Sequence, residues 1–309
     1  MKKILITGGA GFIGYHLTKS LYKNNKLFLF DNLERGQKDK SLKNMLNKNV
    51  KFINKDLTKP INLKIKNISW VFHLAAKVGV KNVIESPLKT LETNTLSLVN
   101  TINFLKNNNF KGRFVFFSTS EVYSPLIFKK LAKQPISEIK DLIIPRDVKS
   151  RDSYYLSKIF GEKLVQLSGF NYNIVRPHNI YGPRMGSSHV IPELIKKISN
   201  KNKATIQSPS HKRAFCFIDD AVKQILKITK SDKKNTTFNI GNPTEEIKML
   251  ELAKKIKLLI NSKSLLLKGK ITLGSPPRRV PSIQKLVKIT HFTNLDFGLR
   301  KTIEWYLKK

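Results

Sequence analysis

The segment SYYLSKIFGE, residues 153–162, places two tyrosines close to a lysine. Residues three or four positions apart lie on nearly the same face of a helix, so either Tyr154 or Tyr155 could contact Lys158. A free tyrosine has a pKa of about 10 and is a poor base at neutral pH, but a nearby ammonium group favours the phenolate. The segment therefore predicts a tyrosine general base assisted by a lysine, and the spacing alone leaves open which tyrosine it is.

A glycine-rich turn near the N-terminus has the composition of a phosphate site. Gly8, Gly11 and Gly14 fall between an apolar strand and a segment of helical period. Glycine adopts unusual backbone angles, lets a pyrophosphate approach the backbone, and here precedes a helix N-terminus that attracts anions. Asp31 ends the next apolar strand, where a carboxylate would bind adenosine ribose hydroxyls and repel a 2′-phosphate. We therefore expect NAD as the cofactor, and Arg35 just beyond is the feature that leaves NADP open.

These groups need a scaffold that positions them. Short apolar runs alternate with longer segments of helical period, which is typical of a Rossmann-type α/β fold with a doubly wound parallel sheet. The expected strands are 3–7, 26–31, 50–54, 70–75, 113–118 and 172–177, and the expected helices are 12–24, 90–109 and 152–168. Beyond them we expect a smaller C-terminal α/β lobe, with a strand-like segment at 213–218 and helices at 191–200 and near 219–230, 248–260 and 296–307.

The composition is strongly basic. A formal net charge of +37 would ordinarily suggest nucleic acid or an anionic surface as a partner. However, 48 of the 58 basic residues are lysines, and they are dispersed along the chain. Nucleic-acid readers instead tend to cluster arginines and interleave aromatic residues. We therefore expect no nucleic-acid partner, and keep a nucleic-acid-binding protein on a catalytically silent scaffold as the rival from another class.

Cysteine content and hydropathy indicate the cellular compartment in which the protein is expected. Cys216 is the only cysteine, which permits no internal disulfide and no cysteine-rich metal site, so we expect no metal. No apolar run approaches the roughly 20 residues of a membrane span. The N-terminal apolar run reaches glycine too soon for a signal peptide. We therefore expect a cytoplasmic protein with no membrane partner.

The glycine spacing, Thr7 followed by G-x-x-G-x-x-G, resembles the entry motif of the extended short-chain dehydrogenase/reductase superfamily, the NAD-dependent nucleotide-sugar epimerases and dehydratases. Further motifs of that family follow in the same order. They are DN at 31–32, DL at 56–57, HLAA at 73–76, Asn94 in ETNTL, FFSTSEVY at 116–123, SYYLSK at 153–158 and RPHNIYGPR at 176–184. The resemblance covers essentially the whole chain. It implies an NAD-binding Rossmann domain at 1–178, to which 212–242 return, and a nucleotide-sugar-binding lobe at 179–309.

The resemblance also implies the catalytic residues. The family pattern Y-x-x-x-K selects Tyr154 as the base and leaves Tyr155 as a packing residue. Lys158 would lower the pKa of Tyr154 and orient the nicotinamide ribose. Tyr154 would remove a proton from a sugar hydroxyl as hydride leaves the same carbon for NAD. Thr119 would hydrogen-bond that hydroxyl from the end of the fifth strand, and Glu121 would handle the second proton.

Binding residues are implied in the same way. The cofactor contacts are Gly8, Gly11, Phe12, Ile13, Gly14, Asp31, Asn32, Asp56, Leu57, Leu74, Ala75, Ala76, Asn94, Tyr154 and Lys158. The substrate contacts are Asn179, Arg184, Val190, Arg213 and Arg279. Arg213 and Arg279 are expected to hold the diphosphate, because a guanidinium fork matches paired phosphate oxygens, and Asn179 also faces the phosphates. The backbone of 189–193 is expected to frame the nucleotide base.

The sequence leaves three possible reactions after oxidation of the sugar at C4: epimerisation, decarboxylation and dehydration. Ser120 stands where dTDP-glucose 4,6-dehydratases carry an aspartate, and the sequence T-S-E at 119–121 is that of UDP-glucuronate decarboxylases and GDP-mannose 4,6-dehydratases. Two later segments, 212–222 and 239–256, resemble the UDP-glucuronate decarboxylase-like branch. For a UDP sugar we rank 4-epimerase first, UDP-glucuronate decarboxylase close behind and 4,6-dehydratase third.

The resemblance further implies a homodimer through the helices near 90–109 and 152–168.

Three features depart from the family pattern. His178 stands where an apolar residue is common, and either touches the sugar or is simply hydrogen-bonded. Ser282 replaces an acid. The segment 124–150 differs in length and content, and we expect it to line or cover the sugar pocket.

Overall fold

The structure is a computed structural model that describes residues 1–138, 141–286 and 291–308. Its backbone forms two compact units. The first unit comprises Met1–Val122, Ile144–Arg176 and Ile225–Phe238, and the second comprises Tyr123–Ile143, Pro177–Gln224 and Asn239–Lys309. These boundaries differ from the predicted ones. Residues 123–143 belong to the second unit, and of the predicted return at 212–242 only 225–238 joins the first.

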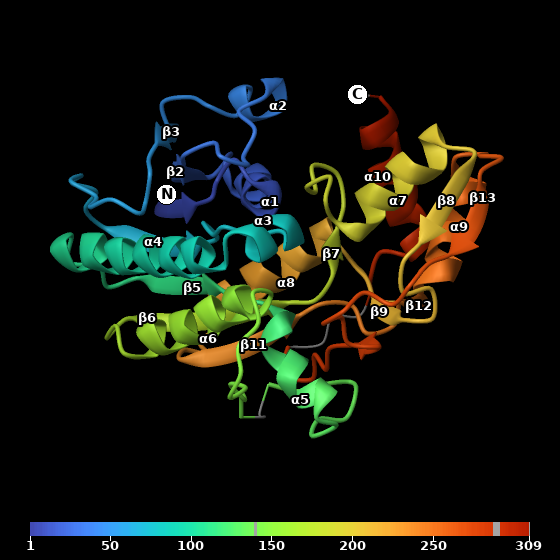
Figure 1. Cartoon of the computed structure of the whole chain (residues 1–309). Helices are drawn as coiled ribbons and strands as arrows, with labels where there is room; N and C mark the ends of the chain where they lie inside the picture. The colour runs from blue at the N-terminus through green and yellow to red at the C-terminus, as the bar shows by residue number, and fades with distance from the viewer. Residues whose placement is uncertain (139–140, 287–290, 309) are drawn as a thin grey trace. The chain divides into compact units, whose positions relative to one another are not determined.

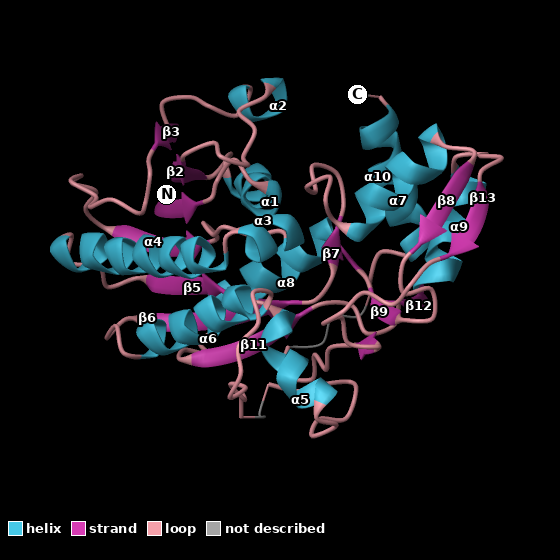
Figure 2. Ribbon diagram, in the orientation of Figure 1, coloured by secondary structure: helices cyan, strands magenta, loops and turns pink. Residues whose placement is uncertain are grey.

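A seven-stranded sheet in the order β11-β6-β5-β4-β1-β2-β3 forms the scaffold (Figure 2). The pairings of β1 with β2 and β4, of β2 with β3, and of β5 with β4 and β6 are all parallel. The strands are β1 (Lys2–Thr7), β2 (Asn25–Asp31), β3 (Val50–Asn54), β4 (Ile68–His73), β5 (Arg113–Phe117), β6 (Asn171–Pro177) and β11 (Thr236–Ile240). The six predicted strands are therefore confirmed, and β11 is a seventh that we did not predict.

The central strands read as continuous apolar runs because both faces of the sheet are covered. Ile4, Leu5 and Ile6 of β1 are fully buried, although adjacent side chains point to opposite faces. Leu5 pairs in register with Phe28 of β2 and Val71 of β4, and all three belong to one buried apolar cluster. The sequence pattern thus specifies a sheet flanked by helices, and the Rossmann-type fold is confirmed.

Helices α4 and α6 lie side by side against this sheet (Figure 1). Helices between the sheet strands include α1 (Phe12–Leu21), α2 (Lys40–Lys43), α3 (Val80–Glu85), α4 (Pro87–Asn107), α6 (Asp152–Gln166) and α8 (Ile218–Lys230). Gly161 of α6 allows close packing here. A Cβ at Gly161 would lie 2.5 Å from Phe116 Cζ on β5 and 3.2 Å from a methyl group of Leu98 on α4.

The remaining strands are shorter and form three small sheets, in the orders β12-β9-β14, β10-β7 and β13-β8. The strands are β7 (Ile180–Tyr181), β8 (Lys203–Ile206), β9 (Lys212–Ala214), β10 (Cys216–Phe217), β12 (Glu246–Lys248), β13 (Leu265–Lys268) and β14 (Arg278–Arg279). The helices are η1 (Ser120–Tyr123), α5 (Ser124–Phe128), α7 (Val190–Asn200), α9 (Met249–Leu259) and α10 (Leu295–Leu307). Each helix predicted in this part of the chain is confirmed, and the strand-like segment 213–218 is two short strands.

Asn239 explains why residues 123–143 join the second unit. Its side-chain oxygen accepts a hydrogen bond from the Tyr123 hydroxyl at 3.0 Å, and its amide donates to the Ile136 carbonyl at 2.9 Å and the Ser282 carbonyl at 3.0 Å. The backbone N–H of Asn239 donates to the Glu138 carboxylate at 2.7 Å. The bonds to Tyr123, Ile136 and Glu138 join residues more than 100 positions apart, so no local pattern could have placed this boundary.

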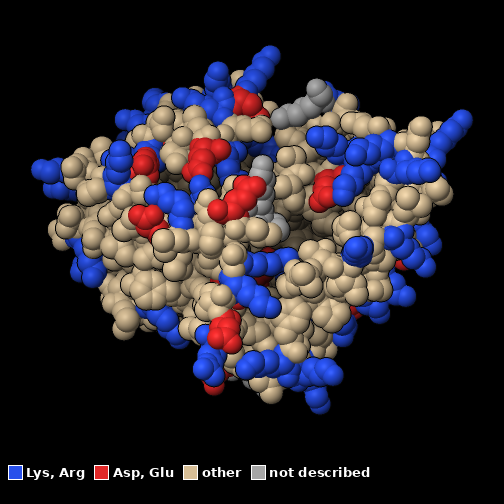
Figure 3. Space-filling view, in the orientation of Figure 1, with Lys and Arg blue, Asp and Glu red and all other residues tan. Residues whose placement is uncertain are grey.

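Basic side chains are scattered over the face shown in Figure 3 and do not form a single stripe. Among the described residues, no helix is both long and apolar enough to cross a bilayer. The same residues contain no cluster of three or more His, Cys, Asp or Glu side chains that could hold a metal ion.

Candidate active site

The glycine-rich turn connects β1 to the first turn of α1. Gly8 has φ +69°, a conformation that favours glycine, and its N–H donates to the Phe30 carbonyl at 2.7 Å. A Cβ at Gly14 would overlap the Gly8 carbonyl oxygen, so Gly14 lets α1 approach the turn. The first turn of α1 has no acidic residue, and its N-cap, Gly11, supplies no side-chain cap. The amides at this helix start, with the positive end of the helix dipole, therefore suit a phosphate group.

Asp31 lies at the end of β2, beside the glycine turn. Its carboxylate accepts hydrogen bonds from the Ala10 N–H at 3.0 Å and from the Leu33 N–H at 2.8 Å. Burial raises the pKa of Asp31, while these backbone hydrogen bonds lower it. Because each carboxylate oxygen has more than one lone pair, Asp31 retains acceptor capacity for the ribose hydroxyls of an adenosine.

The other predicted cofactor residues follow the carboxyl ends of neighbouring strands. Asn32 follows β2, Asp56 and Leu57 follow β3, and residues 74–76 follow β4. Since the sheet order is β4-β1-β2-β3, the structure places these segments along one edge with the glycine turn. The Leu57 side chain is buried in the core, so only its backbone could face a cofactor.

Asn94 is also a predicted cofactor residue, but it lies on helix α4 and not after a strand of the sheet. Its side-chain oxygen accepts the Lys77 N–H at 2.6 Å, and its amide donates to the Lys77 carbonyl at 3.2 Å and the Ser157 hydroxyl at 2.9 Å. The Ser157 hydroxyl in turn donates to the Tyr154 carbonyl at 2.6 Å. Both amide donors of Asn94 are thus used in joining the loop after β4 to α6, which leaves only its oxygen for a cofactor.

The two tyrosines of α6 have different surroundings. The Tyr154 side chain is hydrogen-bonded to Thr119 and lies within electrostatic reach of Glu121. Tyr155 is buried and is hydrogen-bonded to Asp152 near the start of the helix. Only Tyr154 is therefore joined to the predicted catalytic residues at the end of β5. This is the arrangement that the family pattern implied.

The pKa of Tyr154 is raised above its ordinary value in this structure, opposite to the direction that we expected from a neighbouring lysine. Burial, and then the negative charge of Glu121, raise this pKa, whereas the hydrogen bond to Thr119 and the positive charge of Arg35 lower it. We expected Lys158 to supply the cation, but the cation that lowers the pKa in this structure is Arg35. Arg35 was noted in the sequence only for its bearing on a 2′-phosphate.

The side chain of Lys158 is held close to Tyr154 by a hydrogen bond to a backbone carbonyl. Its ammonium group donates to the Phe117 carbonyl at 2.8 Å and lies 5.9 Å from the centre of the Tyr154 ring. Burial lowers the pKa of Lys158 to about 7, while the carboxylate of Glu162 raises it. Lys158 can therefore change its charge near neutral pH, and Glu162 is the residue that favours the charged form.

A buried ion pair between Glu162 and Arg176, next to Lys158, was not predicted from the sequence. Glu162 accepts two hydrogen bonds from the Arg176 guanidinium, at 2.9 and 2.6 Å, and a third from the Ser118 hydroxyl at 2.5 Å. The side chains of Glu162 and Arg176 are only 3% and 5% exposed. An acid four positions after Lys158, on the buried face of the helix, was the signal that could have revealed it. The pair fixes the carboxyl end of β5, from which Thr119 and the Phe117 carbonyl project.

The predicted diphosphate ligands belong to the second unit. Arg279 of β14 pairs with Arg213 of β9, and both side chains are buried. Arg213 donates to the Ser275 hydroxyl at 2.6 Å, and the Asn179 amide donates to the Ala214 carbonyl at 3.1 Å. The structure thus brings Arg213, Arg279 and Asn179 together as a cationic group suited to a diphosphate. Of the other two predicted residues, Val190 begins α7 and Arg184 lies in the loop before it.

His178 is fully buried, and its Nε2 lies 3.3 Å from the Asn239 side-chain oxygen. Its ring is 6.1 Å from that of Tyr123. Of the two alternatives left by the sequence, the structure shows the hydrogen-bonded histidine. Ser282 contributes a backbone carbonyl to the same buried cluster.

The residues at the sheet edge suit a dinucleotide. The glycine turn offers amides to a pyrophosphate, Asp31 offers a carboxylate to ribose, and Tyr154 and Lys158 lie farther along the edge, beyond β4. When bound, NAD would supply a hydride acceptor there. The chain's own residues would supply its binding, its orientation and the movement of protons.

Comparisons with known proteins agree with this geometry. The model of the NAD dependent epimerase/dehydratase family matches residues 4–241. The chain is 32% identical to UDP-glucuronic acid decarboxylase 5 of Arabidopsis thaliana, over 93% of this chain and 83% of that protein. It is 30% identical to UDP-N-acetyl-alpha-D-glucosaminuronate decarboxylase of Bacillus cytotoxicus, over 99% and 98% of the two chains. The structure of UDP-N-acetylglucosamine 4-epimerase from Methanobrevibacter ruminantium is similar with a TM-score of 0.85, at 25% identity over 99% and 98%.

The family model spans the dinucleotide edge, the tyrosine–lysine helix and part of the second unit, and the curated relatives extend the likeness to the rest of that unit. The resemblance seen in the motifs is confirmed, as are an enzymatic function and dependence on NAD. This chain belongs to the NAD dependent epimerase/dehydratase family, whose members modify nucleotide sugars.

Proposed function

We propose that this enzyme oxidises C4 of a UDP-linked uronic acid and releases its carboxylate as carbon dioxide. One observation carries the proposal: two relatives named as decarboxylases of UDP-linked uronic acids are 32% and 30% identical over 93% and 99% of this chain. This reverses the order in which the motifs alone rank epimerase and decarboxylase.

The residues at the end of β5 can perform the proton transfers. Tyr154 would act as the base that takes the proton of the C4 hydroxyl while Thr119 holds the same oxygen, and NAD, held by the glycine turn and Asp31, would supply the hydride acceptor. The resulting 4-ketone makes the sugar a β-keto acid. The bond from C5 to the carboxylate carbon then breaks, its electron pair moves toward the ketone oxygen, and carbon dioxide departs. Glu121 would deliver a proton to C5, and Tyr154 would return its proton to the C4 oxygen, while the reduced cofactor would supply the hydride that restores C4.

The charged groups of the second unit support a diphosphate-linked substrate. Arg213 and Arg279 occupy paired positions on adjacent strands, and cross-strand partners project to the same face of a sheet. Two adjacent buried guanidinium groups are stabilised when a doubly charged ligand binds both. We assign them, with Asn179, Arg184 and Val190, to the nucleoside diphosphate.

A second candidate is 4-epimerisation of a UDP sugar, which is favoured by the likeness at TM-score 0.85 and 25% identity to UDP-N-acetylglucosamine 4-epimerase. Epimerisation needs the same oxidation at C4, and it differs only in returning hydride to the opposite face of the ketone. Tyr154, Thr119 and Lys158 would act alike in both reactions.

Incubation with a panel of UDP sugars tests the proposal. The panel contains UDP-glucuronate, UDP-N-acetylglucosaminuronate, UDP-glucose and UDP-N-acetylglucosamine, and the products are analysed by mass and by proton NMR. We expect the uronic acids to lose the mass of one carbon dioxide and the neutral sugars to remain unchanged. Unchanged mass with an inverted C4 signal would establish the epimerase instead. Loss of one water would establish a dehydratase.

We also propose that the enzyme is a homodimer through α4 and α6. Three large apolar side chains on these two helices and one directly after α6 are exposed: Leu88, Leu96, Phe160 and Leu167, at 77%, 37%, 51% and 83%. Helices with an apolar outward face are typical of a helical bundle between subunits. Two helices from each copy would then bury these side chains in a four-helix arrangement.

Sedimentation equilibrium at micromolar concentration is expected to give a dimer for the wild type and a monomer for Phe160→Glu, because the substitution buries an unpaired charge in the interface. Leu258→Glu is the matched control, since Leu258 is 80% exposed on α9, outside this face. A monomeric wild type, or a Leu258→Glu variant that dissociates like Phe160→Glu, would remove α4 and α6 as the interface.

From the single cysteine and the dispersed lysines we further propose a cytoplasmic location and no nucleic-acid partner.

A further inference from the structure

The order of the sheet brings two loops to either side of the glycine turn. Strand β1 lies between β4 and β2, and the chain leaves all three strands at the same edge. The loop after β2 and the loop after β4 therefore flank the end of β1, where the glycine turn begins. Any contact between these two loops must pass across that end of β1.

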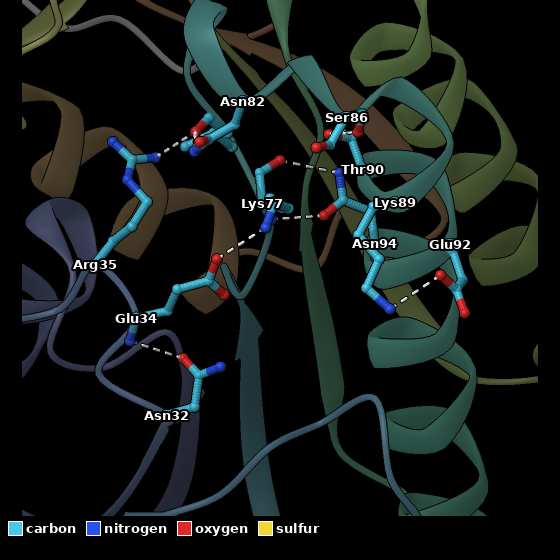
Figure 4. A network of polar contacts seen from close by, with 11 residues as sticks. Asn32, Glu34, Arg35, Lys77, Asn82, Ser86, Lys89, Thr90, Glu92 and Asn94 are labelled. Atoms are coloured by element: carbon cyan, nitrogen blue, oxygen red, sulfur yellow. Dashed lines mark hydrogen bonds and ion pairs between the residues drawn. The ribbon is translucent and has the colours of Figure 1, made fainter. Parts of the chain in front are cut away.

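Two such contacts are present. The Lys77 ammonium group, in the loop after β4, lies 2.9 Å from the Glu34 carboxylate, in the loop after β2 (Figure 4). The Arg35 guanidinium donates to the Val78 carbonyl at 3.1 Å. We call Glu34, Arg35, Lys77 and Val78 the clasp. Its two contacts join segments 43 positions apart in the sequence.

The loop after β2 is folded so that it presents the acidic and basic side chains of the clasp. The Asp31 carboxylate accepts the Leu33 N–H at 2.8 Å, and the Asn32 side-chain oxygen accepts the Glu34 N–H at 3.1 Å. Both are local turns in which a side chain bonds backbone two residues on. Leu33 has φ +62°, which this turn requires. Glu34 and Arg35 are thereby directed toward the other loop.

The loop after β4 is also fixed by hydrogen bonds to its backbone. Asn94 of α4 binds both the N–H and the carbonyl of Lys77, as Figure 4 shows. The same Asn94 side chain is bonded to Ser157 of α6. An ion pair between two such anchored segments loses less entropy on forming than one between free side chains on a helix surface.

The clasp also reaches the catalytic residues. The positive charge of Arg35 acts on Tyr154 by lowering the pKa of its phenol, while the Arg35 guanidinium donates to the Val78 carbonyl. The clasp therefore couples the loop after Asp31 to the catalytic tyrosine. Its two contacts cross the end of β1, where the glycine turn that would hold a dinucleotide begins.

We propose that the clasp of Glu34, Arg35, Lys77 and Val78 spans the NAD site and opens for the cofactor to enter or leave. The clasp is a gate, distinct from a simple ligand of NAD. Weakening a gate accelerates both binding and release, whereas removing a ligand accelerates release alone.

The experiment measures NAD association and dissociation by stopped-flow fluorescence, with no sugar substrate present, for the wild type, Glu34→Gln, Lys77→Met and the double variant. Each single variant is expected to raise both rate constants by roughly two- to fivefold, the range for an exposed ion pair. The double variant is expected to be no faster than either single one, because both substitutions remove the same contact. Salt should accelerate the wild type more than the variants.

Figure 4 contains the matched control. Lys89 and Glu92 form an ion pair at 3.1 Å within α4, with exposure similar to that of Glu34. Glu92→Gln is expected to leave both rate constants unchanged. Thermal melting of each variant confirms that the fold is intact.

Three results would overturn the proposal. These are faster release with unchanged association, effects that add in the double variant, or a wild type that binds no NAD. Because no sugar is turned over in the measurement, failure of the decarboxylase proposal would leave this test unaffected. The clasp is supported if the association and dissociation rate constants of NAD rise together and if the double variant is no faster than the single ones. This holds whichever nucleotide sugar the enzyme accepts.

Discussion

Tyr154→Phe is expected to lower kcat by about 10²- to 10⁴-fold, which is the usual contribution of a general base. The substitution removes the hydroxyl of the side chain that is hydrogen-bonded to Thr119 and leaves the aromatic ring in place. Turnover of the best UDP sugar in the panel is measured together with the amount of NAD bound. Bound NAD should remain close to that of the wild type, since the glycine turn and Asp31 are untouched.

Tyr155→Phe is the control for this prediction. Tyr155 is buried and bonded to Asp152, so its hydroxyl contributes to stability, by about 1 kcal/mol. We expect most of the activity to remain and the urea midpoint to fall slightly. If Tyr155→Phe is inactive and Tyr154→Phe is active, the base is Tyr155 and the grouping at the end of β5 has been misread.

Glu162→Gln is expected to destabilise the fold by about 3–5 kcal/mol, because the buried Arg176 guanidinium loses its carboxylate partner. Equilibrium unfolding in urea measures this loss. The same substitution should alter the pH dependence of turnover, since Glu162 raises the pKa of Lys158 against the effect of burial.

The sign of the pH effect follows from the pKa of about 7 for Lys158, which lies below the ordinary value of 10.5. Between these two values the unfolded chain binds more protons than the folded chain, so this group makes stability rise with pH across that window. An ammonium form required for catalysis is lost as pH rises through the folded pKa. In Glu162→Gln that pKa is lower still, so kcat should decline at a lower pH than in the wild type.

Ser118→Ala separates the charge from the hydrogen bond. It removes the 2.5 Å bond to Glu162 but leaves the carboxylate paired with Arg176. We expect a loss of about 1 kcal/mol and no displacement of the pH profile. A Glu162→Gln variant with the stability and pH profile of Ser118→Ala would show that the charge of Glu162 does not act on Lys158.

The strands of the central sheet are the part of the fold that local sequence specifies best. The run VKFIN at 50–54 coincides with β3, and β1 and β2 extend the predicted strands by one residue each. Strands covered on both faces are continuous apolar runs, and such runs are visible without knowledge of their partners. The short strands β9, β12 and β14 have two or three residues each, too few to carry a periodic pattern. Their pairing with one another decides their conformation.

The candidate site divides in the same way. The glycine turn, Asp31 and the tyrosine–lysine spacing are visible as local motifs, because helix and strand geometry fixes the positions of nearby residues. Spacing could not choose between Tyr154 and Tyr155. That choice needed the family pattern, and the structure adds the contact with Thr119, 35 positions earlier in the chain.

The sequence by itself determined the α/β fold, the dinucleotide edge and the family of reactions, since each is written in residues close together along the chain. Only the tertiary structure disclosed the pairing of Glu162 with Ser118 and Arg176, and the bridge from Glu34 and Arg35 to the loop after β4. These contacts join residues on different elements, 14 to 44 positions apart. Their geometry depends on how helices and loops pack on the sheet, and no local pattern of residues encodes that packing.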